Sequence, residues 1–260
     1  SKISSTSADV NDPTNKRGRV LMIHGWAQNS GVMKMKTKSL TRKLSQAGYE
    51  CVFLDAPFVL PKINRATSES LDSEVTRGGR DNARAWFLYS YSDPTDTSLA
   101  QSEKAMNYIG IDRSLKSIEN ALESEGSKEA FSAVLGFSQG GVLVHLLSAL
   151  AAKSKKSNET PFSKIRCAVI ASGFSAEHDN TGHTESTYEF DNLSGVIDLP
   201  SLHLIGRNDT SVSPGLSKKL VEKYHGAEVH FHEKGHSIPQ KSSDCATIVA
   251  FLDNHNRKQE

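Results

Sequence analysis

The chain has 260 residues, of which 37% are hydrophobic and 23% charged, and its formal net charge is +1. These values are typical of a globular protein that buries a sizeable core without a disulfide or a structural metal. The near-neutral charge balance excludes a global field that would recruit nucleic acid or a membrane surface. Three scattered cysteines without Cys-x-x-Cys spacing predict buried free thiols, a reducing compartment and a cytoplasmic location.

The N-terminal residues 1–18 are rich in Ser, Asp, Asn and Lys and contain no apolar run. This composition predicts a disordered tail and excludes a signal peptide or a membrane span within that segment. No linker-like stretch divides residues 19–260, so we expect them to form a single α/β domain.

The first apolar run, residues 19–23, has the length of a strand and no polar face. Such runs are typical of central strands in parallel sheets, which helices cover on both sides. His24, Gly25 and Trp26 follow and form either an ordinary strand-ending turn or the early loop from which some hydrolases take an oxyanion-binding N–H.

Strands and helices alternate along the rest of the chain. Further strand-like runs lie at 50–54, 131–135, 166–171, 201–205 and 228–232. Helical spacing is found at 33–47, 106–123, 142–150, 216–224 and 244–254. This alternation predicts an α/β fold with a doubly wound, mostly parallel sheet of about six strands flanked by helices, and with reactive residues along one edge. Asp55, at the end of one strand, either contacts a ligand or caps the next turn.

Two irregular segments, near residues 58–107 and 174–199, interrupt the alternation. Long irregular segments inside a compact domain are usually lids or binding loops, which is what we expect here. Trp86 and Phe87 in the first segment either wall an apolar substrate pocket or anchor the loop to the core. The His, Glu and Asp residues of the second segment match no compact metal motif, so we expect no metal site.

A Gly-Phe-Ser-Gln-Gly sequence at residues 136–140 lies between a predicted strand and a predicted helix. It matches G-x-S-x-G, in which a sharp strand-to-helix turn exposes the central serine, and the alternative is a flexible turn with a surface serine. The strand and helix on either side favour Ser138 as a nucleophile. The N–H of Gln139 and the N–H of Trp26 are then the predicted oxyanion donors.

A serine hydroxyl needs an imidazole to accept its proton and a carboxylate to orient that imidazole. Hydrolases with this turn supply them in the chain order Ser, Asp or Glu, His, and Ser138, Asp209 and His236 follow that order. Each comes just after a predicted strand, whereas Asp198 precedes one. We therefore expect these three residues to meet at the carboxyl edge of the sheet.

Several blocks of the sequence resemble the FSH-type serine hydrolases of fungi, animals and plants. The blocks are residues 21–29, 54–57, 84–87, 136–140, 206–209 and 235–239. The resemblance implies an α/β-hydrolase fold, esterase chemistry on acyl esters and no cofactor. The resemblance also implies that Ser138 is the nucleophile, Asp209 the acidic residue and His236 the base of a catalytic triad.

Together, these features predict hydrolysis of a small-molecule acyl ester through an acyl-enzyme intermediate, with no nucleic-acid partner and no stable membrane insertion. An acyl-thioesterase would use the same three residues, as the resemblance to some fungal relatives implies. A catalytically silent hydrolase fold that only binds ligands is the alternative from a different class.

Overall fold

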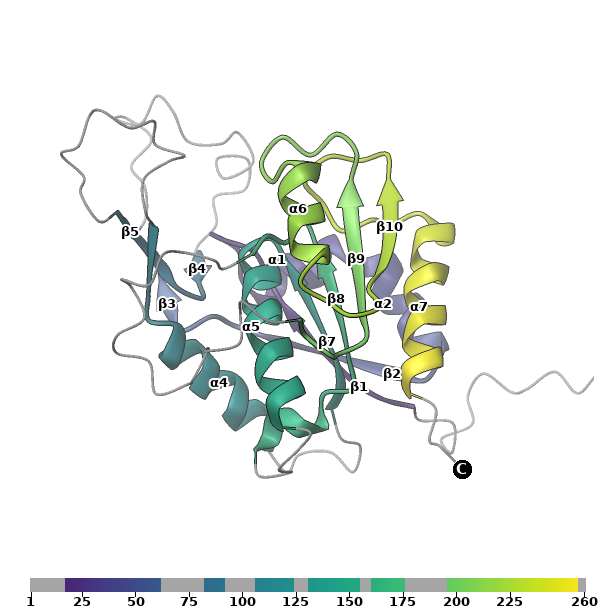
Figure 1. Ribbon diagram of the computed structural model, residues 1–260, viewed down its shortest axis with the longest axis horizontal. Helices are drawn as coiled ribbons and strands as arrows, with labels where there is room; N and C mark the ends of the chain where they lie inside the picture. The colour runs from purple at the N-terminus through teal and green to yellow at the C-terminus, as the bar shows by residue number, and fades with distance from the viewer. Residues whose placement is uncertain are drawn as a thin grey trace, which may run out of the picture.

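The computed structural model describes residues 17–61, 82–91, 106–123, 131–154, 160–175 and 196–256. A six-stranded sheet lies at the centre (Figure 1), with the strand order β10-β9-β8-β7-β1-β2 and parallel pairing between all neighbours. The strands are β1 (Gly18–Ile23), β2 (Tyr49–Leu54), β7 (Phe131–Phe137), β8 (Cys167–Ala171), β9 (Ser201–Gly206) and β10 (Glu228–His232). The predicted parallel sheet of about six strands is confirmed.

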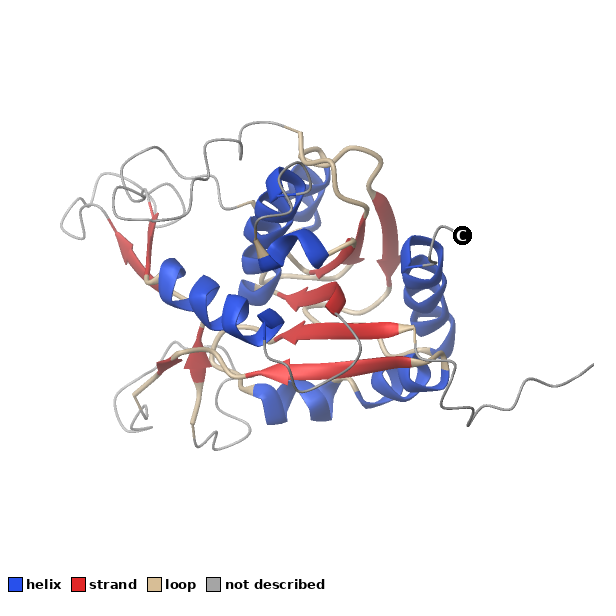
Figure 2. Ribbon diagram, turned by 90° about the horizontal axis from the view of Figure 1, so that it is seen from below, coloured by secondary structure: helices blue, strands red, loops and turns tan. Residues whose placement is uncertain are grey.

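Helices cover both faces of this sheet (Figure 2). One layer consists of α1 (Ser30–Lys36), α2 (Lys38–Gln46) and α7 (Ser242–Asn256). The other consists of α4 (Ile111–Glu123), α5 (Gln139–Ser154), α6 (Pro214–Val221) and the 3-10 helix η1 (Pro161–Lys164). Side chains of β1 alternate between the two cores: Leu21 and Ile23 pack on the α5 side, and Val20 and Met22 on the α7 side. Burial on both faces explains why the strand is apolar throughout.

The predicted helix at residues 33–47 is two helices, because the chain breaks at Thr37. The Thr37 hydroxyl donates to the carbonyl oxygen of Met33 at 2.8 Å, which ends α1. The side chain of Gln240 then accepts hydrogen bonds from the N–H groups of Ser39 (3.1 Å) and Leu40 (3.3 Å) at the start of α2. The acceptor that caps the second helix is therefore 200 positions away from Leu40 in the sequence. The local spacing of apolar residues does not indicate this contact.

The predicted helix at residues 106–123 begins as a strand, which corrects that prediction. β6 (Met106–Ile109) pairs antiparallel with β5 (Leu88–Tyr91), and α4 begins only at Ile111. Gly110, at φ +85°, turns the chain between them in a conformation that favours glycine. A second antiparallel pair, β3 (Phe58–Val59) with β4 (Arg84–Ala85), also lies in the segment predicted to be irregular.

Much of the two predicted lid segments and nearly all of the predicted tail lie outside the described residues. In the described part of the tail, Gly18 opens β1 and the guanidinium of Arg17 pairs with Asp253 at 2.5 Å. None of the three cysteines forms a disulfide, and Cys167 and Cys245 are buried as predicted, whereas Cys51 is partly exposed. Within the described ranges no helix is long and apolar enough to cross a bilayer, and no three His, Cys, Asp or Glu side chains are grouped as metal ligands.

Candidate active site

Ser138 occupies the turn between β7 and α5 with φ +53°, a left-handed conformation that costs a non-glycine residue about 1–2 kcal/mol. Flanking glycines make this turn possible. A Cβ on Gly136 would lie 2.2 Å from the carbonyl oxygen of Gly140, and a Cβ on Gly140 would lie 2.4 Å from that of Ile23. The close approach of β1, β7 and α5 therefore holds Ser138 in its strained position at the carboxyl edge of the sheet.

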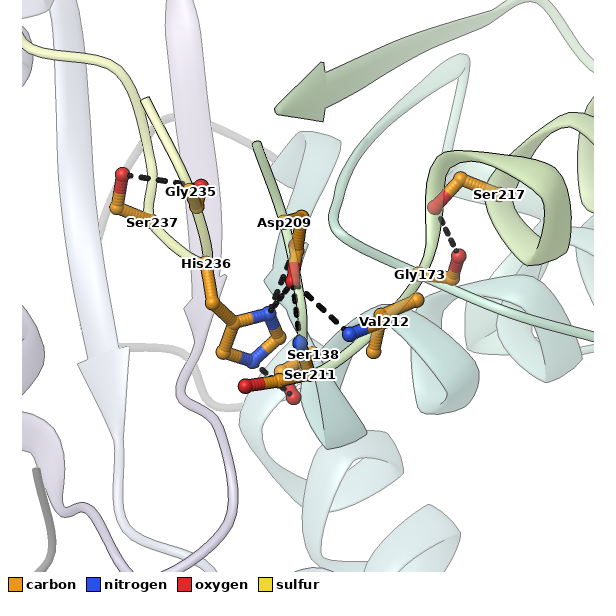
Figure 3. A network of polar contacts seen from close by, with 9 residues as sticks. All are labelled: Ser138, Gly173, Asp209, Ser211, Val212, Ser217, Gly235, His236 and Ser237. Atoms are coloured by element: carbon orange, nitrogen blue, oxygen red, sulfur yellow. Dashed lines mark hydrogen bonds and ion pairs between the residues drawn. The ribbon is translucent and has the colours of Figure 1, made fainter. Parts of the chain in front are cut away.

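The structure brings Ser138, His236 and Asp209 together in one hydrogen-bonded chain (Figure 3). The Nε2 atom of His236 lies 2.9 Å from the Ser138 hydroxyl oxygen, and Nδ1 lies 2.9 Å and 3.1 Å from the two Asp209 carboxylate oxygens. The three residues follow β7, β10 and β9, so strands far apart in the sequence deliver them to one edge. With Nδ1–H donating to the carboxylate, Nε2 is free to accept the serine proton.

The Asp209 carboxylate is buried and held by the backbone that follows it. One oxygen accepts hydrogen bonds from the N–H groups of Ser211 at 3.0 Å and Val212 at 2.9 Å. Burial by itself raises the pKa of Asp209, but hydrogen bonds from His236 and from the Val212 N–H outweigh it, and the pKa is lowered overall. The carboxylate therefore stays ionised at neutral pH beside the imidazole.

The loops that carry Asp209 and His236 are joined to each other. A Cβ on Gly206 would lie 2.5 Å from the carbonyl oxygen of Gly235, so the two loops touch through their backbones. The side-chain amide of Asn208 donates to the Glu233 carbonyl oxygen at 2.8 Å. This contact limits how far the carboxylate and the imidazole can separate.

The predicted oxyanion donors lie on two segments that meet beside Ser138. Gln139 is the first residue of α5, and Trp26 lies in the turn that follows β1. These segments touch where Gly140 packs against the His24 backbone, since a Cβ on Gly140 would lie 2.5 Å from the His24 carbonyl oxygen.

His24 has a structural role that the sequence did not reveal. Its buried ring donates from Nδ1 to the Gly25 carbonyl oxygen at 2.8 Å and accepts at Nε2 from the N–H of Ala56 at 3.1 Å. Burial lowers the pKa of His24 to about 4, so the ring stays neutral at physiological pH. The side chain thereby ties the end of β1 to the end of β2.

Trp86 and Phe87 are fully buried, which favours anchoring of the loop over lining of a substrate pocket, the two roles that the sequence left open. The indole N–H of Trp86 donates to the His24 carbonyl oxygen at 2.8 Å, and its backbone N–H donates to the side-chain oxygen of Gln139 at 2.9 Å. The side-chain N–H₂ of Gln139 donates in turn to the Phe87 carbonyl oxygen at 2.8 Å. Both aromatic residues therefore anchor the loop to the core, and a buried amide bridge joins that loop to the serine turn.

Asp55 supports the start of α1, a helix that precedes it in the chain, and not the turn that follows it as the sequence suggested. Its carboxylate accepts a hydrogen bond from the N–H of Ser30, the first residue of α1, at 2.7 Å. The guanidinium of Arg84 donates to the Ala56 carbonyl oxygen at 2.8 Å. These contacts hold the β2 end, the start of α1 and β4 together beneath the site.

A cavity of about 300 Å³ lies beside the imidazole of His236. Its walls include three apolar side chains, Met33, Phe137 and Ile238, and two lysines, Lys36 and Lys234. The ring of Phe137 packs against that of His236 with centroids 4.8 Å apart. The cavity therefore opens directly onto the residue that would move the proton.

Comparisons with known proteins identify the family of the chain. A family model described as "Serine hydrolase (FSH1)" matches residues 14–248. Esterase OVCA2 of Danio rerio is 32% identical over 238 residues, covering 90% of this chain and 96% of the relative. Esterase CG5412 of Drosophila melanogaster is 30% identical over 260 residues, covering all of this chain and 81% of the relative.

Solved structures support the fold. SOBER1 of Arabidopsis thaliana superimposes with a TM-score of 0.55 at 16% identity, covering 92% of this chain and 99% of that chain. Acyl-protein thioesterase 2 of Zea mays superimposes with a TM-score of 0.53 at 18% identity, covering 92% and 95%. These structures confirm the predicted α/β-hydrolase fold, and the family match over nearly the whole chain confirms the resemblance found in the sequence. The chain therefore belongs to the FSH1 serine hydrolase family, and it is a hydrolase.

Proposed function

We propose that the protein hydrolyses carboxylic esters of small molecules, with Ser138 as nucleophile, His236 as general base and acid, and Asp209 as the group that orients the imidazole. The observation that supports this most directly is the hydrogen-bonded chain from Asp209 through His236 to Ser138 at the strained turn. The related proteins named esterases support the same reaction class.

In the proposed reaction, the Ser138 oxygen attacks the ester carbonyl carbon while Nε2 of His236 accepts its proton. Negative charge on the carbonyl oxygen is stabilised by the N–H groups of Trp26 and Gln139, each worth about 3 kcal/mol of barrier. The ionised Asp209 carboxylate stabilises the imidazolium, which gives its proton to the departing alcohol. Water, deprotonated by His236, then attacks the acyl-enzyme and releases the carboxylic acid.

Turnover of p-nitrophenyl esters and labelling by a fluorophosphonate probe test this proposal. We expect Ser138→Ala to abolish labelling and to lower kcat by about a million-fold, and Asp209→Asn to lower it by about 10⁴-fold. Asp198→Asn is the matched control, because Asp198 is exposed and precedes β9 at the opposite edge. Unfolding midpoints show whether each variant keeps its fold. Wild-type turnover by folded Ser138→Ala would refute the assignment.

Thioester hydrolysis is a second candidate, because the same three residues can expel either an alcohol or a thiol. Acyl-protein thioesterase 2 of Zea mays, which shares this fold, is named for thioester hydrolysis. Oxygen esters and thioesters of the same acyl group, assayed in parallel, separate the two by their kcat/KM values. If wild-type protein neither turns over either series nor reacts with the fluorophosphonate, the fold acts in binding alone.

A further inference from the structure

The cavity beside His236 lies on the leaving-group side of the reaction, an inference that rests on the proposed function. The departing atom must come within hydrogen-bond reach of Nε2 to receive its proton. The cavity is lined by His236 and by the residues just after it, including Ile238, whereas Ser138, the proposed nucleophile, and Gln139, a proposed oxyanion donor, do not line it. A leaving group that passes the imidazole therefore enters this space.

The walls of the cavity are fixed before any substrate binds. One wall is the α1–α2 segment with Met33 and Lys36, and the other is the loop after β10. Gln240 joins the two walls, because its side-chain oxygen accepts from the N–H groups that open α2 and its N–H₂ donates to the Pro239 carbonyl oxygen at 2.9 Å. A preformed space of this kind selects its ligand by shape and charge.

The charge of this space is positive although the chain as a whole is nearly neutral. Lys36 and Lys234 line it, and none of its described lining residues is acidic. Glu233, next to Lys234, is engaged elsewhere in an ion pair with Arg207 at 3.0 Å. Of the α1–α2 segment, residues 30–46, Met33 and Lys36 line the cavity.

The interior next to the imidazole is apolar by contrast. Met33, Phe137 and Ile238 are almost fully buried, whereas Lys36 and Lys234 are exposed. The cavity thus changes from apolar next to the imidazole to positively charged at its exposed lysines. A complementary ligand has an apolar part near the scissile bond and a negative group further out.

We propose that this cavity is a leaving-group subsite for alcohols or thiols that carry an anionic group, a carboxylate or a phosphate, beyond a short apolar spacer. Lys234 and Lys36 bind the anion, and Met33, Phe137 and Ile238 contact the spacer. The protein therefore prefers anionic leaving groups over neutral ones of the same size and acidity.

Two esters of one acyl group test this subsite, one with 4-nitrophenol and one with 3-carboxy-4-nitrophenol as the leaving group. The measured quantity is the ratio of kcat/KM for the carboxylated ester to that for the neutral ester, compared between proteins so that intrinsic reactivity cancels. We expect Lys234→Gln to lower this ratio by about two- to five-fold, and Lys234→Glu to lower it further. Raising the salt to about 0.5 M should reduce the wild-type ratio through screening.

Lys241→Gln is the matched control, because Lys241 is an exposed lysine in the same loop that does not line the cavity. Its ratio should equal that of the wild type. Thioesters of 3-mercaptopropanoate and of 2-mercaptoethyl phosphate, each compared with the thioester of a neutral thiol of similar size, distinguish a carboxylate preference from a phosphate preference, and either supports the subsite.

An unchanged ratio in a Lys36→Gln/Lys234→Gln double variant that still turns over the neutral ester would overturn the subsite while leaving the proposed hydrolase function standing. Absence of turnover for every ester and thioester in the wild type would instead remove the proposed function, and the subsite with it.

Discussion

The buried amide of Gln139 makes a testable contribution to stability that is separate from its backbone role in the proposed reaction. Leucine at this position has nearly the same volume but removes both side-chain hydrogen bonds. The N–H of Trp86 and the carbonyl oxygen of Phe87 would then lie in the core without partners. Each unsatisfied buried group costs about 1–3 kcal/mol, so we expect Gln139→Leu to lower the free energy of unfolding by about 2–6 kcal/mol.

Urea unfolding followed by tryptophan fluorescence measures this change, since Trp86 itself reports on the loop. Gln240→Leu is the comparison, because Gln240 makes its hydrogen bonds at the partly exposed start of α2, where loss of a cap costs about 0.5–2 kcal/mol. We also expect fluorophosphonate labelling of Ser138 to slow in Gln139→Leu as the anchored loop loosens. An unfolding midpoint for Gln139→Leu equal to that of the wild type, with an unchanged slope, would refute the reasoning.

Two further predictions concern backbone packing and acid sensitivity. Gly140→Ala should lower the free energy of unfolding by about 1–3 kcal/mol in the same assay, because the new Cβ would lie 2.4 Å from the carbonyl oxygen of Ile23. Gly141→Ala, whose nearest neighbour would be 3.1 Å away, should change stability much less, and equal losses would contradict the packing argument. Burial lowers the pKa of His145 to about 3 and that of His203 to about 4. Below about pH 6.5 the unfolded chain therefore binds protons that the folded chain excludes, and at pH 5 each histidine should lower the free energy of unfolding by about 2 kcal/mol. Unfolding at pH 7.5 and at pH 5 should show a smaller drop for His203→Gln than for the wild type, and identical drops would rule out His203 as a source.

Local features of the sequence were enough to locate the serine turn and to predict that Ser138, Asp209 and His236 meet. The serine turn needs small residues at positions 136 and 140, and both glycines are in contact with the backbone there. The choice of His236 and Asp209 rested on their positions just after strands, and parallel strands bring such positions to one edge. Each of those inferences used only neighbouring residues and a general rule of sheet topology.

Contacts between distant segments decided the features that the sequence did not predict. Thr37 interrupts a continuous helical pattern because Gln240 caps the second helix from the other end of the chain. Ile109 fits the helical spacing but ends a strand, and it is half exposed, at 51%. From sequence, Trp86 could wall a pocket or anchor a loop, and only its hydrogen bonds to His24 and Gln139 favour the anchoring role.

The amino-acid sequence by itself therefore determined the alternating architecture, the glycine-framed serine turn and the chain order of Ser138, Asp209 and His236, because periodicity, glycine placement and chain order are properties of the sequence alone. Only the tertiary structure decided which buried amide joins the aromatic loop to the serine turn. It also decided that His236 lines a cavity together with Lys36 and Lys234. Those features arise where segments tens to hundreds of residues apart pack against each other, and their contacts leave no periodic signal in the chain.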